Sequence, residues 1–547
     1  MLFNGFVLDD TQQIVDNVYV HSIVNIFSFF TGSTFYNGGA TSLTGVYYKP
    51  LLTTFFSLIY TFFGATPFAF HFFQLLLHII NTCFVFLLFK RFFKNSIAFF
   101  LSLVFLIHPI NSETVFYIAD AQDILFFFFG IIAFYLLTII KSKKALVLVI
   151  VSLFFSLLSK ETGIVFIVTS IIYSYLFKPK YFKFMLLSSV CLFVCYVLLR
   201  LNAIGMLSKA ASAPIDRLSL SERLINIPPM FLFYIKQFIY PLYLSSSYQW
   251  VYIQIGFANF FLPLCIDLLV IALLIAIAFI LYKKRMHTYF KLYTFFLGWF
   301  FVGICLHLQL FPLDATVAER WFYFPIVGVL GMLGVVLSVA TSKVHKAFAI
   351  TLMVILILIF SARTFARSFD WRDEFTLVSH DSTVSHNNYY LENMVSINLT
   401  RQERFKEAKI YAEKSISDFP FYTNINTLGT IYTNEKNYKK AKETYLQALK
   451  YGDFYMTYEN LGGLTLVSGN PKDNSALLTN ILKKYPNDDK LWLYLAIEAY
   501  RQKDIDDAKA AINNAYHLNP NYTNAFYQYK ITNNQPIEVK ITTIPGS

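Results

Sequence analysis

The sequence is poor in charged residues and in cysteine. Only 14% of its 547 residues are Asp, Glu, Lys or Arg, whereas soluble domains carry about 25%. So little charge cannot cover a water-exposed surface, and it also excludes an intrinsically disordered chain. The five cysteines all lie inside apolar runs, so neither a disulfide scaffold nor a metal-ligand spacing is indicated. No metal site is therefore predicted.

Apolar and aromatic residues are abundant instead, at 56% and 19% of the chain, and the mean hydropathy is +0.51. A helix needs about 20 mostly apolar residues to cross a bilayer. Candidate spans lie near 67–89, 96–112, 122–140, 145–159, 162–178, 183–200, 257–282, 288–310, 321–341 and 346–362. Two shorter segments, 51–63 and 229–244, are expected to be interfacial or re-entrant. These runs predict a polytopic membrane protein.

The composition changes near residue 363, after which no run is long enough to span a bilayer. Related segments begin near residues 389, 422, 455 and 489. Leu-Gly pairs at 428–429 and 461–462 occupy the same place in two of these segments. Small residues recur at one position of each predicted second helix, at Ala408, Ala441 and Ala508. A period of 33 to 34 residues with this pattern is typical of tetratricopeptide repeats, which are pairs of antiparallel helices.

The predicted fold class is therefore all-α: a polytopic helical membrane domain followed by a tetratricopeptide-repeat α-solenoid. We predict the membrane domain over 1–362, a linker over 363–388, about four repeats over 389–522 and a C-terminal tail over 523–547.

Charge alternates between successive loops of the membrane half. One set of loops carries fourteen basic residues and no acidic one: Lys90, Arg91, Lys94, Lys141, Lys143, Lys144, Lys178, Lys180, Lys183, Lys283, Lys284, Arg285, Lys343 and Lys346. Under the positive-inside rule these loops are cytoplasmic, so the mixed-charge loops and the repeats are extracytoplasmic. The net charge of +12 thus reflects topology and indicates no nucleic-acid partner. The Phe/Ile/Asn/Lys-rich composition favours the cytoplasmic membrane of a prokaryote.

Six motifs follow one another in the membrane half: FVLDDTQQIVDNVYV, YYKPLLTTFFSLIY, PFAFHFFQLLLHIIN, LIHPINSETVFYI, SKET and AERWFYFPIVG. Together with the repeats, this order resembles the TMTC-type protein O-mannosyltransferases, which carry transmembrane and tetratricopeptide regions and belong to the GT-C class of glycosyltransferases. The resemblance extends over about residues 3–520. It implies transfer of a sugar, mannose in the family, from a polyprenyl-phosphate lipid to Ser/Thr hydroxyls of acceptor proteins, which the repeats could recruit.

Such a transfer needs a base for the acceptor proton and cations for the departing phosphate. The resemblance places the catalytic acid at Asp9 or Asp10, in the first outer loop, where one of the two could instead cap the following helix. It also implies a helix upstream of this loop, so we expect the natural chain to begin earlier.

Other charged residues mark the outer ends of spans. Lys160, Arg320 and Lys49 are candidates to bind the donor phosphate, and Lys49 stands where the family has an Arg. Further candidates to support the donor site are His108, Glu113, Glu161 and Glu319. The alternative interpretation of all these positions is interfacial side chains that extend toward water, or helix caps. A non-catalytic membrane-anchored scaffold for envelope assembly is the alternative function.

Overall fold

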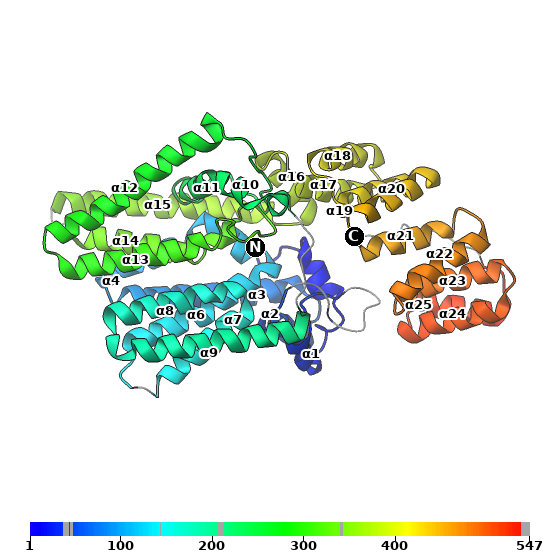
Figure 1. Cartoon of the computed structure of the whole chain (residues 1–547), viewed down its shortest axis with the longest axis horizontal. Helices are drawn as coiled ribbons and strands as arrows, with labels where there is room; N and C mark the ends of the chain where they lie inside the picture. Colours follow the sequence, from blue (N-terminus) through cyan, green and yellow to red (C-terminus); the bar gives the residue numbers. More distant parts are fainter. Residues whose placement is uncertain (37–42, 44–46, 143, 206–212, 340–342, 538–547) are drawn as a thin grey trace. The chain divides into compact units, whose positions relative to one another are not determined.

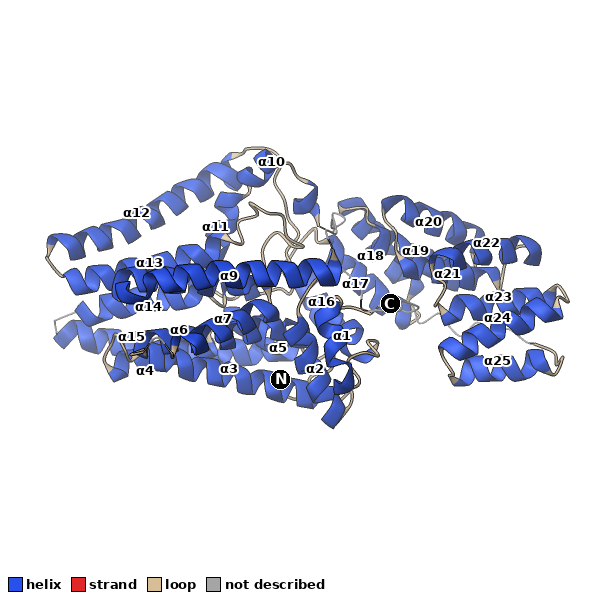
Figure 2. Cartoon of the chain, turned by 60° about the horizontal axis from the view of Figure 1, so that its bottom comes forward, coloured by secondary structure: helices blue, strands red, loops and turns tan. Residues whose placement is uncertain are grey.

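The computed structural model describes residues 1–547 except 37–42, 44–46, 143, 206–212, 340–342 and 538–547; of 343–350 and Tyr522 it describes only the backbone. The chain divides into two compact units: residues 1–35 with 45–386, and residues 36–44 with 387–547. Helices make up both units, and the described residues form no strand; an isolated bridge joins Tyr248 to Val317. Figure 2 shows this throughout, so the predicted all-α fold is confirmed.

Among its described residues, the first unit holds six helical stretches long and apolar enough to cross a bilayer. They are α3 (Pro67–Phe89), η4 with α6 (Ile118–Ile139), α9 (Pro179–Ile204), η7 with α12 (Phe257–Lys283), α13 (His287–Cys305) and Thr351–Asp370 of α15 (Lys343–Asp370). Helices α6, α7 (Leu146–Ser159), α8 (Ile164–Phe177) and α9 run alongside one another (Figure 1). The chain is a multi-pass membrane protein, as predicted.

The other predicted spans are bent or short. The predicted span 96–112 is broken: α4 (Asn95–Ile107) and the segment Pro109–Phe116 meet at 48°. Three more predicted spans contain apolar helices of 14 to 17 residues, namely α7 (Leu146–Ser159), η5 with α8 (Glu161–Phe177) and α14 (Pro325–Val339). The two interfacial candidates contain α2 (Pro50–Phe63) and α11 (Ile227–Ile239).

The second unit consists of helix pairs. They are α17 (Tyr389–Arg401) with α18 (Phe405–Asp418), α19 (Tyr422–Asn434) with α20 (Tyr438–Tyr451), α21 (Tyr455–Thr465) with α22 (Pro471–Lys484), and α23 (Asp489–Arg501) with α24 (Ile505–Leu518). Ala408, Ala441 and Ala508 are completely buried in the second helices of their pairs. A larger side chain at these positions would separate the helices, which explains the recurrence of alanine.

The predicted linker and the predicted C-terminal tail both contain helices. Residues 363–388, the predicted linker, hold the end of α15 and α16 (Glu374–Val384), and this stretch belongs to the first unit as far as His386. Residues 523–547, the predicted tail, hold most of α25 (Tyr522–Thr532), whose Ile531 is buried against α24 and its neighbours. Residues 538–547 of that tail lie outside the described part of the chain.

Candidate functional site

Asp10 is tied to the backbone. It is completely buried, one carboxylate oxygen accepts the Val7 N–H at 2.9 Å, and the other accepts the Ala119 N–H at 2.7 Å. Burial raises the pKa of Asp10 well above its usual value, against the opposing effect of these two hydrogen bonds. Asp10 thereby joins the N-terminal loop to the start of the third predicted span.

Asp9 has different surroundings. It is half-buried, and its backbone N–H donates to the Tyr117 hydroxyl at 3.0 Å. Burial raises the pKa of the Asp9 carboxyl, while nearby Arg320 and Tyr117 lower it and Asp314 raises it further. The Asp9 carboxylate therefore faces charged side chains that the chain contributes from distant parts of its sequence.

Arg320 lies on η8 (Glu319–Phe322), just before α14, and joins two carboxylates. Its guanidinium forms an ion pair with Glu113, and its backbone N–H donates to the other Glu113 oxygen at 2.9 Å. Its Nε lies 3.5 Å from Asp120. The break at Pro109 makes this possible, because Pro109 cannot donate a helical hydrogen bond and the preceding His108 is extended. The chain then starts the short helix α5 (Ser112–Phe116) that carries Glu113.

The two lysine candidates differ in their partners. Lys160 is paired with Asp123, at 2.7 and 2.8 Å from its two oxygens, and is buried. Lys49 is half-buried, and its ammonium lies 4.2 Å from the centre of the Tyr47 ring. Among the residues that the structure describes, no carboxylate forms an ion pair with Lys49, although burial lowers its pKa and Glu161 opposes that effect. Within the described part of the chain, Lys49 is thus a cation without a counter-ion in contact.

The remaining candidates have structural partners. The His108 ring accepts the Ile110 N–H at 3.2 Å, contacts the Phe238 carbonyl at 3.0 Å and stacks on the Phe238 ring. Glu161 lies 3.7 Å from Arg200 in a partly exposed pair. Glu319 is buried, and one of its oxygens accepts the Ser245 N–H and the Tyr248 hydroxyl at 2.7 and 2.6 Å. Burial raises the pKa of Glu319 to about 8.

Asp9 interacts electrostatically with Arg320 and Lys49, and Lys49 with Lys160, so these four residues form one charged cluster, which we call the outer cluster. It also contains residues that sequence reasoning missed: Tyr47, Tyr117, Asp120, Asp123 and Asp314. The Tyr47 hydroxyl donates to Asp314 at 2.8 Å. Asp120 and Asp123 lie at the start of an apolar run. Placing a carboxylate at a membrane boundary costs free energy, so these two residues could have been recognised in the sequence as candidates for the site. Among the described residues, no three His, Cys, Asp or Glu side chains form a metal-binding group.

Comparisons with known proteins give a consistent result. The family model for dolichyl-phosphate-mannose-protein mannosyltransferases matches residues 49–209. The human protein O-mannosyl-transferase TMTC3 is 23% identical over 99% of this chain and 68% of its own length. The Caenorhabditis elegans protein O-mannosyl-transferase F38B6.6 is 23% identical over 70% of this chain and 55% of its own.

Among solved structures, yeast Tom70 aligns with 76% of this chain and 92% of its own, at 13% identity and a TM-score of 0.27. The matched family segment includes Lys49 and Lys160 of the outer cluster and Glu113, the partner of Arg320. The likeness to human TMTC3 continues through the repeats. The chain is therefore similar to the dolichyl-phosphate-mannose-protein mannosyltransferases, and it is a membrane-bound glycosyltransferase.

Proposed function

We propose that the chain transfers mannose from a dolichyl-type polyprenyl phosphate to Ser or Thr hydroxyls of proteins on the extracytoplasmic side of the membrane. The observation that carries this proposal is the electrostatic interaction of the Asp9 carboxyl with Arg320 and Lys49, three residues far apart in the sequence. A carboxylate beside cations at the end of membrane helices provides a base and a phosphate-binding group in one place.

Each group has a role in the transfer. Asp9 accepts the proton of the acceptor hydroxyl, whose oxygen attacks C1 of the mannosyl group. The bond between C1 and the phosphate oxygen breaks, and the polyprenyl phosphate leaves with both bonding electrons. Burial raises the pKa of Asp9, which makes its carboxylate a stronger base than an exposed Asp. Asp10, held by two backbone N–H groups, positions Asp9.

The cations divide the work of binding the phosphate. Lys49 is the first contact that we propose, because no carboxylate neutralises it directly among the described residues. Arg320 offers several N–H donors, so it can bind a phosphate oxygen while it keeps Glu113. Lys160 contributes mainly through its charge because Asp123 occupies its ammonium. Glu113, Glu161 and Glu319 orient these cations and their loops, and His108 stabilises the break before α5.

The test is a transfer assay with the purified chain in lipid vesicles. Polyprenyl-phosphate mannose and Ser/Thr-containing polypeptides are supplied, and mass spectrometry of the acceptors measures the added hexose. We expect hexose on Ser or Thr with the lipid-linked donor and none with a nucleotide-linked mannose. Product from the nucleotide-linked donor alone would contradict the proposed donor class.

The second candidate function is a catalytically silent scaffold. It is favoured by the carboxylates that already neutralise Lys160 and Arg320, since a phosphate must compete with them. Absence of transfer with every donor and acceptor, in a folded chain, would favour this alternative.

A further inference from the structure

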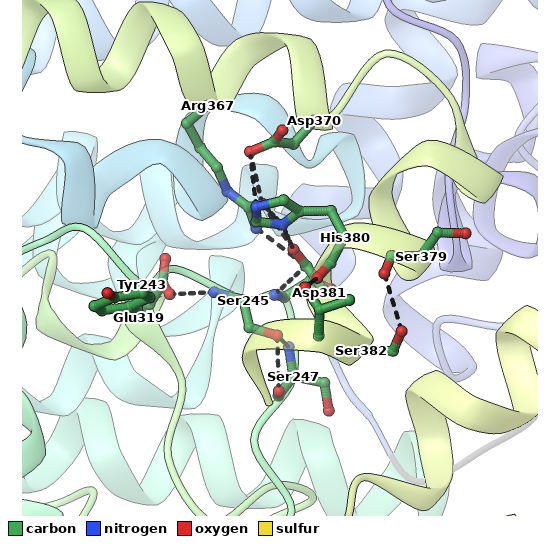
Figure 3. Close-up of polar contacts among 12 residues, drawn as sticks. Tyr243, Ser245, Ser247, Glu319, Arg367, Asp370, Ser379, His380, Asp381 and Ser382 are labelled. Carbon is green, nitrogen blue, oxygen red and sulfur yellow. Dashed lines mark hydrogen bonds and ion pairs between the residues drawn. The ribbon is translucent and has the colours of Figure 1, made fainter. Parts of the chain in front are cut away.

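A buried ion pair joins the last span of the membrane unit to the helix that follows it. Arg367 of α15 donates to both oxygens of Asp381 on α16, at 2.7 and 3.0 Å (Figure 3). Both residues are completely buried. Two further residues lie beside the pair. Asp370 is 3.2 Å from the Arg367 guanidinium, and the His380 ring is 2.8 Å from an Asp381 oxygen. Although burial alone would raise it, the pKa of Asp381 is held below its usual value by Arg367.

The same carboxylate also holds a loop. The second Asp381 oxygen accepts the Ser246 N–H at 2.6 Å, in the segment between α11 and η7. Arg363, one turn before Arg367, donates to the Leu242 carbonyl at 2.9 Å. Arg363 of α15 and Asp381 of α16 therefore hold the two ends of the backbone segment 242–246.

This loop in turn holds the segment that leads into Arg320. Ser245 and Tyr248 bind the Glu319 carboxylate, as Figure 3 shows for Ser245. The Thr316 N–H donates to the Tyr248 carbonyl at 3.0 Å, and the Gln249 amide donates to the Asp314 carbonyl at 3.2 Å. The segment from Asp314 to Glu319, which leads directly into Arg320, is thus bound to the loop that Asp381 anchors.

We propose that Asp381 and Arg367 are positioning residues that set Arg320 and Asp314 against Asp9. This inference rests on the proposed function and adds to it two residues outside the outer cluster. A buried ion pair gives little net stability compared with apolar side chains of similar volume, so precise placement is the benefit expected of this one. Catalytic groups tolerate little displacement: a shift of about 1 Å can lower the rate by about 100-fold.

The test compares Asp381→Asn and Arg367→Lys with the parent in the vesicle transfer assay. Asp381→Asn keeps the size of the side chain but removes its charge, and Arg367→Lys keeps the charge but removes the two-point contact. We expect KM for polyprenyl-phosphate mannose to rise about tenfold or more in both variants, with a smaller change in KM for the acceptor. Glu498→Gln is the control. Glu498 is a buried carboxylate that forms an ion pair with Arg501, but this pair lies in the repeats. Glu498→Gln should lower thermal stability and leave the donor KM unchanged.

A double-mutant cycle strengthens the test. If Asp381 acts through the loop that holds Glu319, the effects of Asp381→Asn and Glu319→Gln on the donor KM are not additive. Binding of polyprenyl phosphate to the same vesicles, measured without transfer, supplies a second readout and should weaken in Asp381→Asn.

The outcomes separate the two proposals. A folded parent that transfers nothing would contradict the proposed function, and phosphate-lipid binding would still test the positioning role. A parent that transfers mannose, together with folded Asp381→Asn and Arg367→Lys variants that keep its donor KM and lipid affinity, would overturn the inference. Should Asp381→Asn fail to fold, Arg367→Lys decides alone, since it keeps the buried charge.

Discussion

Asp9 and Asp10 are adjacent, yet their surroundings give them different chemistry. The Ala119 N–H, from a residue more than one hundred positions away, binds one Asp10 oxygen and leaves Asp9 to face Arg320. The sequence predicts an acidic pair in an outer loop, but it cannot predict which carboxylate is bound, because the partner belongs to another span. The pairs of Lys160 with Asp123 and of Arg320 with Glu113 were unpredictable for the same reason.

The buried Glu319 predicts a pH dependence of stability. Its pKa rises from 4.5 to about 8 on folding, because burial disfavours the charged form. Between these values the folded chain binds a proton that the unfolded chain has released, so stability falls as the pH rises from about 4.5 to about 8. Glu319→Gln removes this contribution, and thermal unfolding in detergent across that range should show a shallower decline.

The exposed Glu407, paired with Arg404, gives a matched control. The hydrogen bond from Arg404 lowers the pKa of Glu407, so Glu407 loses its contribution to stability only as the pH falls below about 4.5. Glu407→Gln should therefore leave the decline in stability between about pH 4.5 and 8 unchanged. An equal decline in the parent and in Glu319→Gln would contradict the assigned role of burial.

At the scale of helices, the apolar runs in the sequence predict which segments are long enough to span a membrane, but they do not predict where a helix breaks. The run 96–112 is continuous in hydropathy, but Pro109 ends α4 at Ile107, and the His108 ring then caps the Ile110 N–H. The helix α16 has no apolar run that would reveal it. A buried ion pair between Arg367 and Asp381 holds it in place, and no periodicity in the sequence records that pair.

Close packing of α13 and α14 gives a prediction for two glycines. A Cβ at Gly328 would lie 2.6 Å from the Phe300 nitrogen and 2.8 Å from the Phe296 carbonyl oxygen, and backbone cannot easily move away. We therefore expect Gly328→Ala to destabilise the chain by about 1–3 kcal/mol. At Gly298, which lies on α13, a Cβ would meet nothing within 4 Å.

Gly298→Ala is the matched control. It should be neutral or stabilising by up to about 1 kcal/mol, because Ala favours a helix more than Gly does. Thermal unfolding of both variants in detergent checks the pair, and equal effects would contradict close contact between α13 and α14 at Gly328.

At the scale of the whole molecule, the charge asymmetry of the loops predicts orientation. Lys284 lies in a basic loop and Lys472 lies in the repeats, and both are exposed. With the five native cysteines replaced, Lys472→Cys should react with an impermeant thiol reagent in intact cells, and Lys284→Cys should react only after permeabilisation. The opposite pattern would place the outer cluster on the cytoplasmic side and contradict the proposed site of transfer.

The most direct test of the site is the transfer rate of Asp9→Asn in vesicles. Asn keeps the shape of the side chain but cannot accept the acceptor proton, so the rate should fall about 10²–10⁴-fold with the donor KM little changed. Asp10→Asn is the companion variant, and it should lose thermal stability because Asp10 binds two buried N–H groups. A folded Asp9→Asn variant that transfers mannose as fast as the parent would contradict Asp9 as the base.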